Sequence, residues 1–215
     1  MSDTGPLVRA DAIVVAAGRS TRMGGEDKLA AEIEGRPLLA WTLAALAAAR
    51  EVERIVVVTT ADRRADVAAA DWLPANVVEV VIGGERRQES VHAGFAALER
   101  LGADAADVVL VHDAARPLVT PELVAAVATA TARHGAAIPI VPVAETLKRI
   151  DGPLVGATVD RTGLGAAQTP QGAQRDLLRE AYRRFPADGP DTFTDEASLL
   201  EACSIEVHVV SGDPG

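Results

Sequence analysis

The chain has 215 residues, is 48% hydrophobic and 24% charged, and therefore suits one large domain with a sizeable core rather than a disordered acidic chain. Its formal charge of −10 argues against a nucleic-acid partner, and the lack of a secretion signal or of an apolar run of about 18 residues argues against a membrane partner. The single cysteine, Cys203, cannot form an internal disulfide, so we expect a cytoplasmic protein.

Short β-branched runs alternate with Ala- and Leu-rich helical stretches along the chain. We predict strands at residues 12–16, 54–59, 76–82, 107–112, 137–141 and 205–210. We predict helices from Pro37, over 86–101, from Thr120, over 175–185 and over 194–203. Most of the strands are nearly continuous apolar runs, as strands buried on both faces are. The alternation predicts a single three-layer, Rossmann-like α/β domain over 1–215, with a mostly parallel sheet and helices on both faces.

A glycine-rich segment follows the first predicted strand, where an open α/β sheet binds its ligand. It runs from Ala16 to Gly25 and continues to Lys28. Its small residues let backbone N–H groups approach phosphates, while Arg22 and Lys28 supply positive charge. It is neither a Walker A loop nor a dinucleotide fingerprint, because Ser20 occupies the second glycine position. A plain structural turn remains the alternative.

Two further polar clusters also follow predicted strands. In residues 83–90 a double glycine opens a helix near Ser90 and could frame the edge of a base, although a turn and a solvated helix face would look the same. In residues 112–117, Asp113 at a strand end could hold Mg²⁺ and Arg116 could hold an anionic group. We expect His112 to be packed at the strand end rather than to act as a base.

The segment from about 145 to 171 breaks the alternation of strands and helices. It is rich in glycine, threonine and polar residues and has no long helical period. We interpret it as an extended β-arm that returns to the domain near Thr169. Thr146 and Arg161 on this arm could contact a phosphate, although a solvated polar segment would have the same composition.

Six sequence blocks narrow these possibilities further. They are Ala-Ala-Gly-x-x-x-Arg-Met with a following lysine, Gly-Gly-x-x-Arg-x-x-Ser-Val, Val-His-Asp-Ala-Ala-Arg-Pro, Thr-Val-Asp-Arg-x-Gly-Leu with Gln-Thr-Pro-Gln, and Thr-Asp-Glu-Ala-Ser. Together they are similar to the motifs of the 2-C-methyl-D-erythritol 4-phosphate cytidylyltransferase family, nucleotidyltransferases of isoprenoid biosynthesis by the non-mevalonate pathway. The resemblance extends from Ala12 to Asp213 and implies a nucleotidyltransferase domain.

The resemblance implies that CTP is coupled to methylerythritol phosphate with Mg²⁺, and that pyrophosphate is released. It implies catalytic roles for Arg22, Lys28 and Arg161. It implies nucleotide contacts by Ala16, Ala17, Gly18, Gly83, Glu85, Ser90, Asp113 and Ala114, with Asp113 also as the metal ligand. It implies acceptor contacts by Arg116, Thr146 and Thr169. Finally, it implies a homodimer with interlocking arms (residues 145–171), in which Thr146 and Arg161 could serve the site of the neighbouring subunit.

The sequence departs from the family pattern at a few positions, and alternative functions stay open. Val15 stands where proline is common, Glu85 stands where aspartate is common, and the family's Asn-x-Lys-x-Thr block would follow Gly215. A ribitol 5-phosphate cytidylyltransferase or another sugar-phosphate or molybdopterin nucleotidyltransferase would share the first loop, and a non-catalytic nucleotide-binding domain is a further alternative. A nicotinamide-dependent oxidoreductase is disfavoured because the glycine fingerprint is incomplete.

Overall fold

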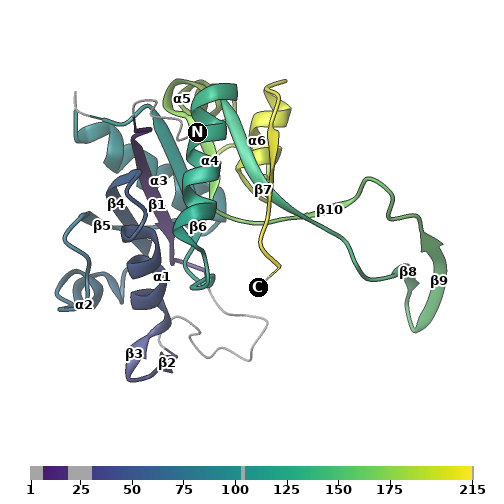
Figure 1. Ribbon diagram of the computed structural model, residues 1–215, viewed down its shortest axis with the longest axis horizontal. Coiled ribbons are helices and arrows are strands. Elements are labelled where there is room, and N and C mark those ends of the chain that lie inside the picture. Colours follow the sequence, from purple (N-terminus) through teal and green to yellow (C-terminus); the bar gives the residue numbers. More distant parts are fainter. Residues whose placement is uncertain (1–6, 19–30, 103–104, 215) are drawn as a thin grey trace, which may run out of the picture.

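The computed structural model describes residues 7–18, 31–102 and 105–214, and these residues form a central sheet of eight strands. The strands are β1 (Ala10–Val15), β4 (Val52–Thr59), β5 (Val77–Ile82), β6 (Val108–Asp113), β7 (Ala136–Pro142), β10 (Gly165–Ala167), β11 (Gln171–Gln174) and β12 (His208–Ser211). Their order is β10-β7-β11-β6-β1-β4-β5, with β12 also paired to β7 (Figure 1). β1 pairs in parallel with both β4 and β6, and β4 with β5, which confirms the predicted mostly parallel α/β sheet.

Helices cover both faces of this sheet. On one face lie α1 (Leu38–Ala47), the short α2 (Arg64–Ala68) and α4 (Pro121–His134), and on the other lie α3 (Arg87–Arg100), α5 (Arg175–Arg184) and α6 (Glu196–Ala202). Successive strand residues point to opposite faces, so Val14 of β1 joins the first core cluster and Ile13 joins the second. None of the helices in the described ranges is long and apolar enough to cross a membrane.

Local sequence explains where two of the helices begin and how closely they pack. The Thr120 hydroxyl caps α4 by accepting a hydrogen bond from the Leu123 amide at 3.2 Å, and Pro121 takes the first helical position, as the sequence predicts. In α3, Gly94 permits close contact with the sheet, because a Cβ there would lie 2.5 Å from Ile13 Cγ2. This contact packs the middle of α3 directly against β1 and β4.

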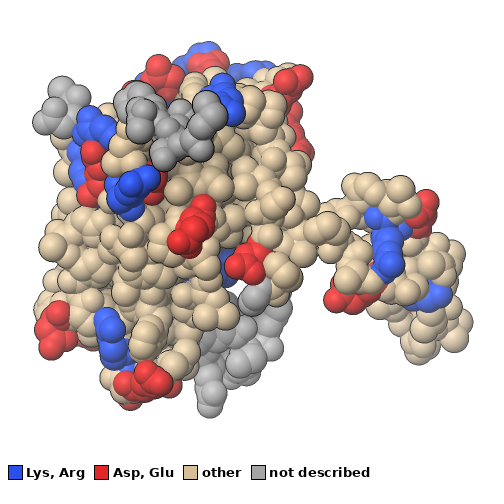
Figure 2. All heavy atoms as spheres, in the orientation of Figure 1, with Lys and Arg blue, Asp and Glu red and all other residues tan. Residues whose placement is uncertain are grey.

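A hairpin of β8 (Leu147–Asp151) and β9 (Leu154–Val159) projects from the body (Figure 1). Figure 2 shows the same hairpin standing clear of the body, with acidic and basic side chains on it. Ile150, Leu154 and Val155 on it are 79%, 68% and 74% exposed. Apolar side chains gathered at such exposure are typical of an interaction surface. The chain then rejoins the main sheet through β10, which pairs antiparallel with β7.

Some elements differ from the sequence expectations. The last strand begins at His208 rather than at 205, because the Ile205 amide still hydrogen-bonds to the carbonyl of Leu200 at the end of α6. The short α2, the β2 (Glu32–Ile33) and β3 (Arg36–Pro37) pair, β10 and β11 were not predicted. β11 has no apolar alternation, and it depends on tertiary packing, since a Cβ at Gly172 would lie 2.1 Å from Thr131 Oγ1 of α4.

A buried carboxylate ties several elements together at the amino end of β1. The Asp11 side chain is fully buried and accepts hydrogen bonds at 2.8 and 2.7 Å from the guanidinium of Arg54. Arg175 of α5 also pairs with it, and the Ala106 amide donates to it at 3.2 Å. Asp11 therefore holds β4 and α5 against β1.

We expect Asp11→Ala to lower the free energy of unfolding by about 3–5 kcal/mol, because it leaves two largely buried guanidinium groups without their shared partner. Urea denaturation measures this change. Glu53→Ala is the matched control, because it removes the exposed ion pair with Arg9 and should change stability by less than about 1 kcal/mol. Equal losses in the two variants would contradict the structural role of Asp11.

His112 is fully buried at the end of β6, as expected from the sequence. Its Nδ1 lies 3.0 Å from Thr169 Oγ1, and its Nε2 lies 3.1 Å from the carbonyl oxygen of Arg116. Nε2 therefore carries the proton and donates it to this carbonyl, and Nδ1 accepts from the Thr169 hydroxyl. Burial lowers the pKa of His112 from 6.5 to about 4, so the neutral imidazole is the folded form.

His112 makes stability sensitive to acid, and the sign follows from its lowered pKa. The unfolded chain takes up the proton first, so the stabilisation is complete above about pH 6.5 and is lost as the pH falls towards 4. The loss over this range is up to about 3 kcal/mol. His112→Gln should therefore lose less stability between pH 7 and pH 4.5 than the unmodified protein in urea denaturation. An identical acid dependence in the variant would refute this origin.

Candidate active site

The carboxyl ends of β1, β4 and β6 lie side by side and carry residues that the sequence singles out. The Ala16 amide donates to the carbonyl of Val58 at 2.7 Å, and the Ala114 amide donates to the carbonyl of Val15 at 3.1 Å. The segments after these strands therefore lie at one edge of the sheet, where parallel α/β sheets bind ligands. Ala16 and Ala114 are buried, while Gly18 is exposed.

Close packing joins this edge to the segment after β5. A Cβ at Gly83 would lie 2.5 Å from Ser90 Oγ and 2.6 Å from the Cβ of Ala17, so only glycine fits. The Gly83 amide also donates to the carbonyl of Thr59 at 2.9 Å. Two clusters predicted separately from the sequence are therefore in contact. Ser90 is buried, and its hydroxyl donates at 3.3 Å to the carbonyl of Arg86 within the first turn of α3.

The first turn of α3 is fixed from outside the helix. Arg86 at the N-cap donates to Glu89 Oε1 at 2.6 Å and to the carbonyls of Ala187 and Gly189 at 2.6 and 2.8 Å. Hydrogen bonds from Arg86 hold the pKa of Glu89 below its ordinary value. The exposed Glu85 donates its amide to Glu89 Oε2 at 2.9 Å. This helix start, with its partial positive charge, suits an electron-rich group of a ligand.

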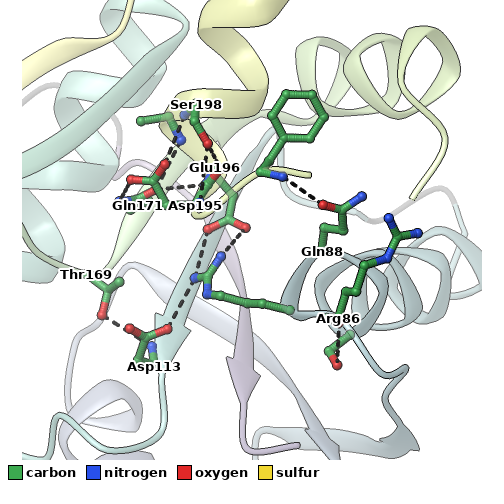
Figure 3. A network of polar contacts seen from close by, with 12 residues as sticks. Arg86, Gln88, Asp113, Thr169, Gln171, Asp195, Glu196 and Ser198 are labelled. Carbon is green, nitrogen blue, oxygen red and sulfur yellow. Dashed lines mark hydrogen bonds and ion pairs between the residues drawn. The ribbon is translucent and has the colours of Figure 1, made fainter. Parts of the chain in front are cut away.

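A partly buried arginine, Arg87, joins α3 to two carboxylates, Asp113 and Glu196, which are labelled in Figure 3. The Arg87 guanidinium donates to both oxygens of Glu196 at 2.8 and 3.1 Å, and to Asp113 Oδ1 at 3.1 Å. Burial lowers the pKa of Arg87, but the two carboxylates outweigh burial and raise this pKa above its ordinary value. Arg87 is therefore a fixed cation, and it holds one oxygen of Asp113.

The second oxygen of Asp113 faces the opening of the site. The side chain of Asp113 is 36% exposed, and Oδ2 lies 3.6 Å from Nε of Arg116. A hard carboxylate oxygen at a strand end fits Mg²⁺, which is held by one or two carboxylates together with phosphates and water. In the described part of the chain, no group of three or more His, Cys, Asp or Glu residues could hold a metal ion.

A cavity of about 230 Å³ lies beside Asp113. It is lined by Ala115, Arg116, Pro117, Leu118, Val119, Leu123, Gln168, Thr169 and Asp213. The structure thus brings Arg116 and Thr169 together in one hollow. The Thr169 hydroxyl accepts from the Asp113 amide at 3.2 Å, so the cavity adjoins the end of β6 directly.

Two of the sequence-predicted residues, Thr146 and Arg161, are not brought to this edge. Thr146 directly precedes β8 and Arg161 follows β9; both are exposed, and Arg161 donates to the carbonyl of Ala144. In the ranges that the structure describes, neither makes a hydrogen bond to Asp113 or Thr169. Arg22 and Lys28 lie outside the described residues.

Sequence reasoning assigned no role to Arg87 and Glu196. Both lie inside blocks that carry the family resemblance, but they are 109 residues apart. Only the fold shows that they pair and that Arg87 reaches Asp113. The presence of each residue in a motif was the available indication of a functional role. The sequence did not show which residue each of them contacts.

Comparisons with known proteins agree with this geometry. The sequence model of the family described as 2-C-methyl-D-erythritol 4-phosphate cytidylyltransferase (IspD) matches residues 10–215. A relative of that name from Acidobacterium capsulatum is 39% identical over 219 residues, which cover 96% of this chain and 90% of the relative. The crystal structure of the Thermus thermophilus protein of the same name has a TM-score of 0.75 and 34% identity, covering 96% of this chain and 90% of that one.

Other relatives are longer than this chain. The bifunctional enzyme IspD/IspF of Rhodopseudomonas palustris strain HaA2 is 42% identical over 211 residues, which cover 95% of this chain and 51% of the relative. The chain thus spans about half the length of the bifunctional relatives that it matches. Because the family model covers nearly the whole chain and relatives of single function match over most of their length, this chain belongs to the 2-C-methyl-D-erythritol 4-phosphate cytidylyltransferase family.

Proposed function

We propose that the protein transfers the cytidylyl group of CTP to 2-C-methyl-D-erythritol 4-phosphate and releases pyrophosphate. Membership of the family supports this activity. The observation that carries it is the close packing of Ala17, Gly83 and Ser90 at the same edge of the sheet as Asp113, a carboxylate whose side chain is 36% exposed. A nucleotide needs both features, because its base is read by closely packed groups and its phosphates need a metal.

The nucleotide is proposed to lie along Ala16–Gly18 and to place its cytosine against Gly83, Glu85 and Ser90. The tight packing of Gly83 against Ala17 and Ser90 leaves backbone groups to contact the base. Asp113 and Ala114 would then lie near the ribose and the phosphates. Asp113 would hold Mg²⁺, which when bound supplies neutralising charge for the triphosphate.

The acceptor supplies its own nucleophile. An oxygen of its phosphate group attacks the α-phosphorus of CTP, a new P–O bond forms, and the bond to the pyrophosphate leaving group breaks. A phosphate dianion is nucleophilic at neutral pH, so no general base is needed. The burial and full hydrogen bonding of His112 agree with this. Arg116 and Thr169 are proposed to hold the acceptor phosphate in the cavity that they line.

The arm is proposed to join two subunits into a homodimer. Ile150, Leu154 and Val155 present an apolar surface that a second arm could cover. Thr146 and Arg161 lie on the same arm and away from their own chain's cavity lining. They are therefore proposed to reach the acceptor in the site of the partner subunit.

The cytoplasm is the proposed compartment of the protein. Cys203 is a free, buried thiol, and burial raises its pKa. A protonated thiol that pairs with no other cysteine is consistent with a reducing compartment.

We expect Arg22→Ala and Lys28→Ala each to lower kcat by about 10²- to 10³-fold, because each removes positive charge from the developing negative charge at the α-phosphorus. Pyrophosphate release from CTP with methylerythritol phosphate measures kcat, and ribitol 5-phosphate is the comparison acceptor. The melting temperature should stay unchanged. Arg100→Ala is the control, because Arg100 ends α3 in an exposed pair with Glu79. Normal turnover in either site variant would refute the assignment.

Mixing two impaired variants, assayed at a methylerythritol phosphate concentration well below the raised KM, tests whether sites are shared between subunits. Arg161→Ala should raise the KM for methylerythritol phosphate more than the KM for CTP. In a mixed dimer of Arg161→Ala and Lys28→Ala chains, one site would receive both intact residues, so co-refolding should restore about a quarter of the normal activity. No restoration would mean that Arg161 serves its own chain.

A further inference from the structure

The side-chain amide of Gln168 forms two hydrogen bonds with the backbone of the segment that follows β12. Its Nε2 donates to the carbonyl of Asp213 at 2.6 Å, and its Oε1 accepts from the Asp213 amide at 3.0 Å. The amide of one side chain thus pairs with both backbone groups of one residue, as a neighbouring strand would. The two residues are 45 positions apart in the chain.

Gly212 lets this segment pass close to Gln168. A Cβ at Gly212 would lie 2.4 Å from Gln168 Oε1 and 2.8 Å from Val141 Cγ2, so any larger residue would push the segment away. The Gly212 amide also donates to the carbonyl of Ile140 at 2.9 Å, which continues the pairing of β12 with β7. The path of residues 212–213 therefore depends on β7 and on Gln168.

The held segment forms part of the wall of the cavity. Asp213, Gln168, Thr169 and Arg116 all line it. The backbone of Gln168 is itself held in place, because its backbone amide donates a hydrogen bond to the carbonyl of Pro139 at 2.9 Å. The residue that follows it, Thr169, contacts the Asp113 amide. One short stretch of backbone therefore places Thr169 in the cavity lining and, through the Gln168 side chain, holds Asp213 in the same lining.

We propose that Gln168 is a positioning residue. By holding the backbone of Gly212 and Asp213 in place, it sets part of the wall of the acceptor pocket. This inference rests on the proposed function, because it takes the cavity as the site of the acceptor. Gln168 acts only through the backbone that it holds. Its loss should therefore impair use of the acceptor and leave the nucleotide unaffected, since the nucleotide is proposed to bind at residues 16–18 and 83–90.

Kinetics of Gln168→Ala and Gly212→Ala test the proposal. Loss of two hydrogen bonds should raise the KM for methylerythritol phosphate on the order of tenfold, with the KM for CTP within about twofold of normal. Hydrogen exchange of the Asp213 amide should become faster in Gln168→Ala. The melting temperatures should show that both variants are folded. Gln174→Ala is the control, because its side-chain amide likewise binds a backbone carbonyl, that of Ala132, but lies outside the cavity lining.

Each outcome decides the matter. A rise in the acceptor KM alone, in both variants and not in the control, supports the proposal. An active enzyme whose acceptor KM is unchanged, or whose KM for CTP rises equally, overturns it. An unmodified protein that releases no pyrophosphate from CTP and methylerythritol phosphate overturns the proposed function itself, so the two failures are told apart. Because Gly212→Ala keeps residue 168 as glutamine and displaces the segment by the added Cβ, it tests the wall even if Gln168→Ala does not fold.

Discussion

The site depends on the pairing of the Arg87 guanidinium with two carboxylates, those of Asp113 and Glu196. It joins the start of α3, the end of β6 and the start of α6 in one ion-pair network. Glu196 is the buried member of this network, and burying a carboxylate costs several kcal/mol unless it is paired with good geometry. The planar fork of arginine meets this condition by binding Glu196 with two nitrogens and reaching Asp113 with one of them. Lysine, a point charge, could not divide its hydrogen bonds in this way.

The start of α6 must be placed accurately for this pairing, and β11 places it. The Gln171 side chain accepts from the Glu196 and Ala197 amides at 3.0 and 3.1 Å and donates to Asp195 at 2.9 Å. Asp195 in turn caps the helix by accepting from the Ser198 amide. β11 pairs antiparallel with β6, so the strand that carries Asp113 also helps to position the helix that carries Glu196, the other carboxylate bound by Arg87.

The parallel core could be predicted from sequence because its pattern is local. Residues 108–111 are a continuous apolar run, and such runs indicate strands whatever lies around them. β11 could not be predicted, since Gln-Gly-Ala-Gln becomes a strand only because Gly172 fits against α4. The strand-end clusters were visible individually, but the contact of Ala17 with Gly83 and the pairing of Arg87 with Glu196 exist only in three dimensions. The parts assigned to Thr146 and Arg161 remain predictions.

Two carboxylates at opposite ends of the same sheet show what separates a structural charge from one that is available to a ligand. Asp11 receives donors from two arginines and a backbone amide, and water does not reach it. Asp113 accepts a hydrogen bond from Arg87 through one oxygen, its other oxygen has Arg116 at 3.6 Å, and its side chain is 36% exposed. Residue type is the same in both places, so the number of donors decides the role. An acidic chain can also receive an anionic ligand, because charges act strongly only over a few ångströms. The cations placed next to the ligand therefore matter more than the net charge of the chain.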